Sequence, residues 1–183
     1  MNRLGQVFLF LFVANIAFAQ STLKYVDAWK EYQRGLEMWD NHNYLAARQT
    51  FENAKLQPFS NTSQPDVLLQ NLDFYIAASA VENNDNDAEQ LLQQYMLNYH
   101  ETDKRRQVYF LLGKYYFGNK KYTEAITFLE KAKPEDLVPS QQSEYKFMMG
   151  YSYFTRKKFE EAKPFFKQLK GTNDKYVYPA NYY

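Results

Sequence analysis

The 183-residue chain has no cysteine and only two histidines. Without cysteine it can form neither a disulfide nor a thiolate site for zinc. His42 and His100 lie far apart in polar stretches, so we expect solvated loop residues rather than a metal pair or a catalytic base. The acidic run 83–87 lacks the glycine and the bidentate glutamate of a calcium loop. The sequence therefore predicts no metal, no cofactor and no catalytic residue.

The chain also lacks an excess of charge of either sign. Without residues 1–19, which contain Arg3 but no acidic residue, the 22 basic residues fall to 21, equal to the number of acidic residues. A protein that binds nucleic acid needs a surplus of lysine and arginine to neutralise phosphates. Nucleic acid is therefore not expected as a partner.

Residues 1–19 have the pattern of a removable signal peptide. Arg3 precedes an apolar run over 7–17, and Ala17-Phe18-Ala19 has the small-x-small form of a cleavage site before Gln20. The apolar run is shorter than the roughly 20 residues of a membrane span, although a retained anchor is the alternative. We expect an exported chain, in the periplasm or at the outer membrane, without a membrane span after cleavage.

A helical sequence pattern recurs along the remainder of the chain. The pattern is a glycine, a tyrosine three residues later, an alanine twelve residues after the glycine, and a large apolar residue four residues after the alanine. It begins at Gly113 and again at Gly150. A similar copy begins at Gly35, with methionine in place of tyrosine. The 37-residue spacing of the two clearest copies is typical of helical solenoids.

The pattern predicts an all-α, right-handed solenoid made of helical hairpins. The second hairpin has alanine in place of the recurring glycine, but small residues still allow close packing of its helices. The last residues, up to Tyr183, continue an apolar pattern without a polar cap, which favours the front end of a longer array. The expected hairpins span about 23–57, 66–99, 102–133 and 140–170, with the start of a fifth at 175–183.

These residues resemble tetratricopeptide repeat proteins, whose signature is W-x2-L-G-x2-Y, then A-x3-F, then P. Leu112-Gly113-x2-Tyr116 and Met149-Gly150-x2-Tyr153 carry the resemblance. More narrowly, residues 150–154 and 178–183 resemble the N-terminal part of large exported tetratricopeptide repeat proteins of Bacteroidetes-type bacteria. The resemblance implies a non-enzymatic scaffold that binds protein or peptide partners in the periplasm or at the outer membrane.

In stacked hairpins of this kind, the first helix of each unit lines the concave face. Its side chains here are mostly rings, which suit an amphipathic helix or an extended peptide. The alternative is that the superhelix itself, or further repeats, cover these rings. The expected partner-binding residues are Trp29, Tyr32, Trp39, Phe110, Lys114, Phe117, Phe147, Tyr151 and Phe154.

Two other functions remain open at this point. Aromatic faces also stack on sugar rings, so the chain could be an accessory protein for glycan binding or nutrient uptake. It could also be a structural spacer whose rings are all interior, with the activity in a missing C-terminal region.

Overall fold

The computed structural model describes residues 27–59, 62–100, 103–170 and 175–183. The signal peptide predicted for residues 1–19 lies outside this part of the chain. Within the described ranges every regular element is a helix, and none is a strand. The prediction of an all-α fold is confirmed.

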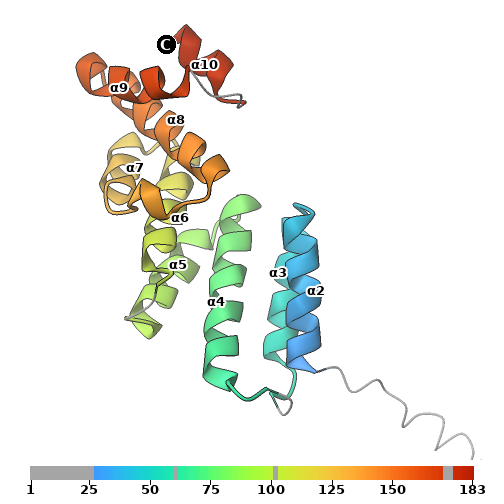
Figure 1. Cartoon of the computed structure of the whole chain (residues 1–183). Coiled ribbons are helices and arrows are strands. Elements are labelled where there is room, and N and C mark those ends of the chain that lie inside the picture. The colour runs from blue at the N-terminus through green and yellow to red at the C-terminus, as the bar shows by residue number, and fades with distance from the viewer. Residues whose placement is uncertain (1–26, 60–61, 101–102, 171–174) are drawn as a thin grey trace, which may run out of the picture.

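The helices pack in consecutive pairs, and each pair also contacts the next along the chain. Figure 1 shows this order, from α2 and α3 at one end to α9 and α10 at the other. A 3-10 helix at Pro134–Asp136 separates two of the pairs. The pairs are α2 (Ala28–Asp40) with α3 (Tyr44–Lys55), α4 (Pro65–Glu82) with α5 (Ala88–Asn98), α6 (Arg105–Gly118) with α7 (Tyr122–Leu129) and α8 (Pro139–Thr155) with α9 (Phe159–Leu169), followed by α10 (Val177–Tyr182).

Two helix ends differ from the expectation, and local chemistry explains both. The first helix was expected from about Leu23, but α2 begins at Ala28 because the Asp27 carboxylate accepts the Trp29 backbone N–H at 3.2 Å and caps it. The helix expected to reach Lys133 ends at Leu129. Pro134 lacks a backbone N–H and disfavours helical geometry at the residue before it, so a short 3-10 helix follows instead.

The four turns within the pairs share one backbone conformation. Each contains one non-glycine residue in the left-handed region, with φ between 58° and 60°. L-residues rarely adopt this region, and its recurrence at equivalent turns indicates that all four hairpins close by the same geometry. The four residues are His42, Asn84, Lys120 and Lys157.

The recurring glycine is the contact point between the two helices of a hairpin. A Cβ atom built on Gly113 would lie 2.5 Å from Cγ of Leu129, and one on Gly150 would lie 2.8 Å from the ring of Phe166. Both distances are shorter than any ordinary contact. The spacing between the glycine and the large apolar residue in the sequence therefore reflects a close crossing of the two helices.

We expect Gly113→Ala to lower the free energy of unfolding, although alanine is the better helix former. The helical preference favours alanine by up to about 1 kcal/mol, whereas overpacking a tight contact costs about 1–3 kcal/mol. Gly118→Ala is the matched control, because a Cβ atom on Gly118 would lie 3.8 Å from Oδ1 of Asn84, which is an ordinary contact distance. Urea unfolding of both variants measures the difference, and equal stability of the two would contradict the close crossing.

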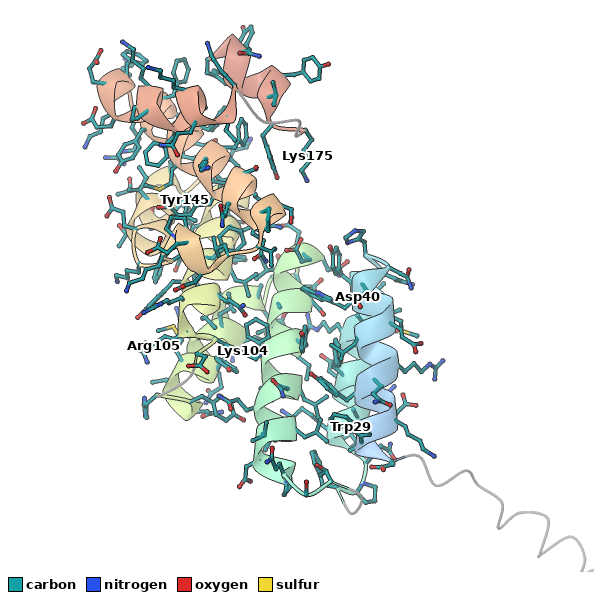
Figure 2. The ribbon with its side chains drawn as sticks, in the orientation of Figure 1. Trp29, Asp40, Lys104, Arg105, Tyr145 and Lys175 are labelled. Carbon is teal, nitrogen blue, oxygen red and sulfur yellow. The ribbon has the colours of Figure 1, made fainter. Side chains whose placement is uncertain are left out.

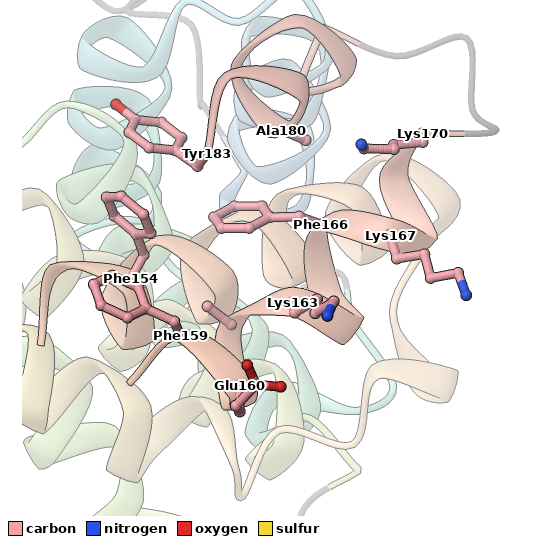
Figure 3. Close-up of a pocket in the computed structure, with 10 residues that line it drawn as sticks. Phe154, Phe159, Glu160, Lys163, Phe166, Lys167, Lys170, Ala180 and Tyr183 are labelled. Atoms are coloured by element: carbon pink, nitrogen blue, oxygen red, sulfur yellow. The ribbon is translucent and has the colours of Figure 1, made fainter. Parts of the chain in front are cut away.

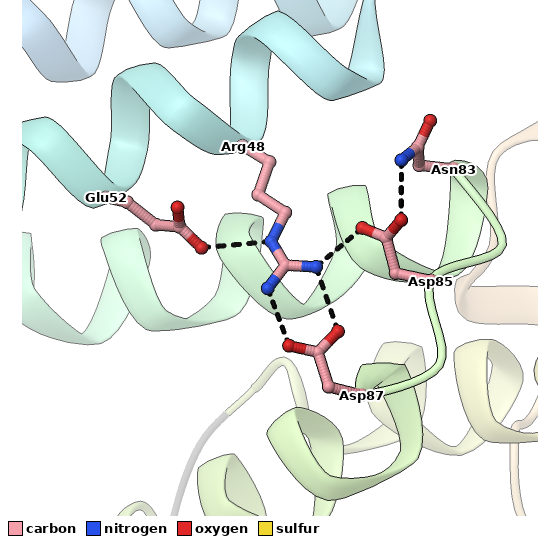
Figure 4. Close-up of polar contacts among 5 residues, drawn as sticks. All are labelled: Arg48, Glu52, Asn83, Asp85 and Asp87. Atoms are coloured by element: carbon pink, nitrogen blue, oxygen red, sulfur yellow. Dashed lines mark hydrogen bonds and ion pairs between the residues drawn. The ribbon is translucent and has the colours of Figure 1, made fainter.

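Arg48 joins the first hairpin to the turn of the second (Figure 4). Its guanidinium donates to both carboxylate oxygens of Asp87, at 2.6 and 2.9 Å, and to Asp85 and Glu52 at 2.5 and 2.9 Å. The hydrogen bonds from Arg48 hold the pKa of Asp87 below its ordinary value. The acidic run 83–87 thus binds an arginine of the neighbouring hairpin.

Candidate functional site

A cavity of about 670 Å³ runs across the hairpins, and we call it the cross-repeat groove. Its walls come from the end of α2, the following turn, the start of α3, the end of α4, and from α6 and α8. Figure 2 labels two of its residues, Asp40 at the end of α2 and Lys175 before α10. The lining residues are Trp39, Asp40, His42, Tyr44, Glu82, Lys114, Val138, Ser140, Gln141, Glu144 and Lys175.

The wall from the first hairpin is aromatic. The ring of Trp39 lies edge-on to those of Tyr44 and Tyr75, with centroid distances of 5.0 and 5.5 Å. The hydroxyl of Tyr44 lies 2.8 Å from Nδ1 of His42. The turn residue His42 thus helps to fix the Tyr44 ring, and the groove gains a wide, mostly apolar wall with one polar edge.

An ion-pair cluster lines another part of the groove. The Lys114 ammonium on α6 lies 2.7 Å from a carboxylate oxygen of Glu82 on α4 and 2.9 Å from one of Glu144 on α8. Burial alone would lower the pKa of Lys114, but its attraction to Glu144 and Glu82 and their hydrogen bonds raise that pKa above its ordinary value. Lys114 therefore stays charged and ties three consecutive hairpins together.

The burial of Phe110 and Tyr32 contradicts the expectation that their rings lie on an open face. Only 1% of the Phe110 surface is exposed, because α6 is enclosed by contacts with α4, α5, α7 and α8. Tyr32 is 8% exposed, and burial raises the pKa of its phenol to about 12. Phe110 is part of the hydrophobic core, and Tyr32 offers little surface to a partner.

The rings predicted on the last two hairpins are packed against other rings. Tyr176 stacks on Phe147, with centroids 5.1 Å apart, and Tyr183 lies 5.1 Å from Tyr151 and 5.0 Å from Phe154. Residues on either side of and within α10 therefore cover much of this face. The alternative in which the rings are covered describes this end of the molecule better than an open groove. Phe117 belongs to the same cluster, 6.3 Å from Phe147 and 5.7 Å from Tyr151.

A separate cavity of about 540 Å³ lies between α9 and α10 (Figure 3). Rings of Phe154, Phe159, Phe166 and Tyr183 line it, and lysines of α9 lie at its edge. Of the nine predicted residues, only Phe154 is found here. The structure thus divides the predicted set among three cavities, the core and the partly buried ring cluster of Phe117, Phe147 and Tyr151. It brings only Trp39 and Lys114 together in the cross-repeat groove.

The sequence reasoning missed the carboxylates that hold Lys114. Glu82 and Glu144 lie 32 and 30 residues from Lys114, on the hairpins before and after it. An alternation of sign along the first helices of successive hairpins was the available signal. Tyr44 was missed because it begins a second helix, whereas the prediction considered only first helices.

Comparison with known protein families finds a match in two segments of the chain. The sequence profile described as tetratricopeptide repeat matches residues 107–133 and 143–175, which contain most of α6 to α9. These segments are similar to tetratricopeptide repeats. The paired helices of the described residues form an all-α solenoid of tetratricopeptide-like hairpins, as predicted. Neither the curated proteins nor the solved structures compared with the chain give a match.

Tetratricopeptide repeats are generally protein–protein interaction modules and non-enzymatic scaffolds. In the described ranges, no three histidine, aspartate or glutamate side chains gather closely enough to hold a metal ion. None of the helices in this part of the chain combines the length and apolar character needed to cross a membrane.

Proposed function

We propose that this chain is a non-enzymatic scaffold that binds a segment of a protein partner in the cross-repeat groove. The observation that carries the proposal is the composition of that groove. Its lining combines large rings, Trp39 and Tyr44, with an ion-pair cluster centred on Lys114, and these groups come from four hairpins. Tetratricopeptide-like repeats, to which two segments of the chain are similar, generally serve protein binding.

The groove favours a peptide segment that contains both apolar and polar residues over one that is wholly apolar or wholly polar. Rings provide apolar anchor sites with little loss of side-chain entropy. Asp40, Glu82 and Glu144 face the groove together with Lys114 and Lys175, so both signs of charge are present. An extended peptide with an apolar residue and neighbouring polar groups matches this surface, because the apolar residue can pack on the rings and the polar groups can pair with the charged side chains.

We further propose that the chain acts outside the cytoplasm, in the periplasm or at the outer membrane. The support is the apolar run and the cleavage pattern before Gln20. The binding experiment therefore uses protein purified from the periplasm of cells that express the full sequence. An N-terminal residue other than Gln20 in that protein would contradict export with cleavage at this site.

A displayed library of random peptides, selected on this protein, tests the groove. We expect enriched peptides to bind with Kd in the micromolar range, at about −8 kcal/mol. Ser140→Trp should weaken this binding at least about tenfold, because Ser140 is exposed, lines the groove, and would place a ring in the peptide's path.

Ser63→Trp is the matched control, since Ser63 is equally an exposed serine but lines a different cavity. Circular dichroism of both variants verifies their folding. The proposal is wrong if no peptide is enriched, or if the two substitutions weaken binding by the same factor.

A further inference from the structure

A third cavity, of about 350 Å³, lies at the beginning of α2, and we call it the N-terminal cavity. Figure 2 shows Trp29 at this end of the helix, whereas the cross-repeat groove begins at Trp39. The two tryptophans are ten positions apart on the helix, which corresponds to about 15 Å along the axis. The lining residues are Trp29, Tyr32, Thr62, Ser63, Gln64, Val67, Leu68 and Asn71.

Trp29 provides a large ring that is both held in place and accessible. The Asp27 cap fixes the end of α2 that carries Trp29, and the Trp29 ring contacts that of Tyr32 at a centroid distance of 5.5 Å. Tyr32 is itself buried, yet Trp29 remains 42% exposed. An exposed indole supported by a buried ring offers a firm, flat surface to a ligand.

Among the described residues that line the N-terminal cavity, every polar side chain is neutral. Ser63, Gln64 and Asn71 form no side-chain hydrogen bond with another residue in the described part of the chain. The Thr62 hydroxyl oxygen accepts the Gln64 backbone N–H at 3.2 Å, which leaves its own hydrogen to donate. Hydroxyl and amide groups both donate and accept hydrogen bonds, so this rim can satisfy groups that do the same.

The absence of charged groups among the lining residues restricts the ligand class. A carboxylate or phosphate would need a cation, and an ammonium group would need a carboxylate. A wholly apolar ligand would leave the amides and hydroxyls without partners. A proline-rich peptide offers carbonyl acceptors but few donors, so the oxygen atoms of this rim would stay unpaired.

We propose that the N-terminal cavity binds a neutral saccharide. The C–H groups on one face of a sugar ring carry partial positive charge and match the negative face of the Trp29 indole. Sugar hydroxyls both donate and accept, as do Gln64 and Asn71, which bind them. The cavity volume is at the lower end for small-molecule sites, so it holds one or two units of a longer chain.

Calorimetry with neutral hexasaccharides of glucose, mannose, xylose and N-acetylglucosamine tests this site. We expect at least one of them to bind with Kd between about 10 μM and 1 mM, a range usual for a small polar site. The sequence has two tryptophans, so in the Trp39→Phe variant the fluorescence of Trp29 alone reports binding. The same saccharide should change that fluorescence.

Substitutions separate this site from the cross-repeat groove. Trp29→Ala should weaken saccharide binding at least about tenfold and Asn71→Ala severalfold, while Ser63→Trp blocks the cavity and Ser140→Trp has no effect. Because the peptide and saccharide experiments respond to different serines, one proposal can fail without the other. Absence of binding to all four hexasaccharides, equal binding by Trp29→Ala, or a Trp29 response only to a proline-rich peptide would overturn the inference.

Discussion

Replacing Phe110 with alanine is expected to lower the free energy of unfolding by about 3–5 kcal/mol, the usual cost of emptying a buried phenylalanine site. Phe110 is 1% exposed and belongs to the largest hydrophobic cluster, which joins α4 to α8. Domains are stable by only about 5–15 kcal/mol, so this loss is a large part of the total. Urea unfolding followed by far-UV circular dichroism measures it.

Phe159→Ala is the control for the same change at an exposed position. Phe159 begins α9 and is 54% exposed, so its loss should cost less than about 1 kcal/mol. The comparison also decides between the two assignments of Phe110. If Phe110→Ala left stability unchanged but abolished peptide binding, Phe110 would be a partner-binding residue after all.

Replacing Lys114 with methionine is expected to lower the free energy of unfolding by about 2–3 kcal/mol. Removing one member of a fully buried ion pair costs about 3–5 kcal/mol, and the partial exposure of this cluster reduces the effect. Methionine keeps most of the apolar stem but leaves Glu82 and Glu144 facing each other without a cation. Additional Glu82→Gln and Glu144→Gln substitutions remove that repulsion, so the triple variant should recover most of the loss.

The pH dependence of this difference has a definite sign. The folded-state pKa of Lys114 is raised above the ordinary 10.5, so its ion pairs stabilise the fold fully below that pH. The stabilisation is lost as the pH rises through the folded pKa, where the ammonium group deprotonates. The stabilities of the native chain and Lys114→Met should therefore converge as the pH rises above about 10.5. A constant difference over that range would show that Lys114 acts only through its packing.

The hairpins could be predicted because their determinants lie close together in the sequence. Gly113 and Leu129 lie sixteen residues apart, and their contact is repeated at Gly150 and Phe166. Such local contacts repeat from unit to unit, so periodicity alone predicts them. The helix ends depend on single groups such as the Asp27 cap, which residue patterns locate less accurately.

The candidate sites depend on contacts between hairpins, which the sequence pattern does not specify. Lys114 and Trp39 were expected on one face, but the meeting of Lys114 with Glu82 and Glu144 requires a particular stacking of three units. Phe110 has the same helical phase as Lys114, one turn earlier, and is nevertheless buried because four helices surround α6. Burial on a central helix is decided by its neighbours rather than by its own periodicity.

The position of Lys114 at the junction of three hairpins has a mechanical consequence. Solenoids bend by small rotations of each unit against the next, and here one ammonium group spans two successive joints. Any rotation that separates α4 from α6, or α6 from α8, must stretch an ion pair. Lys114 therefore resists rotation at both of these joints at once, and a molecule seated beside it adds its own contacts to the same two joints.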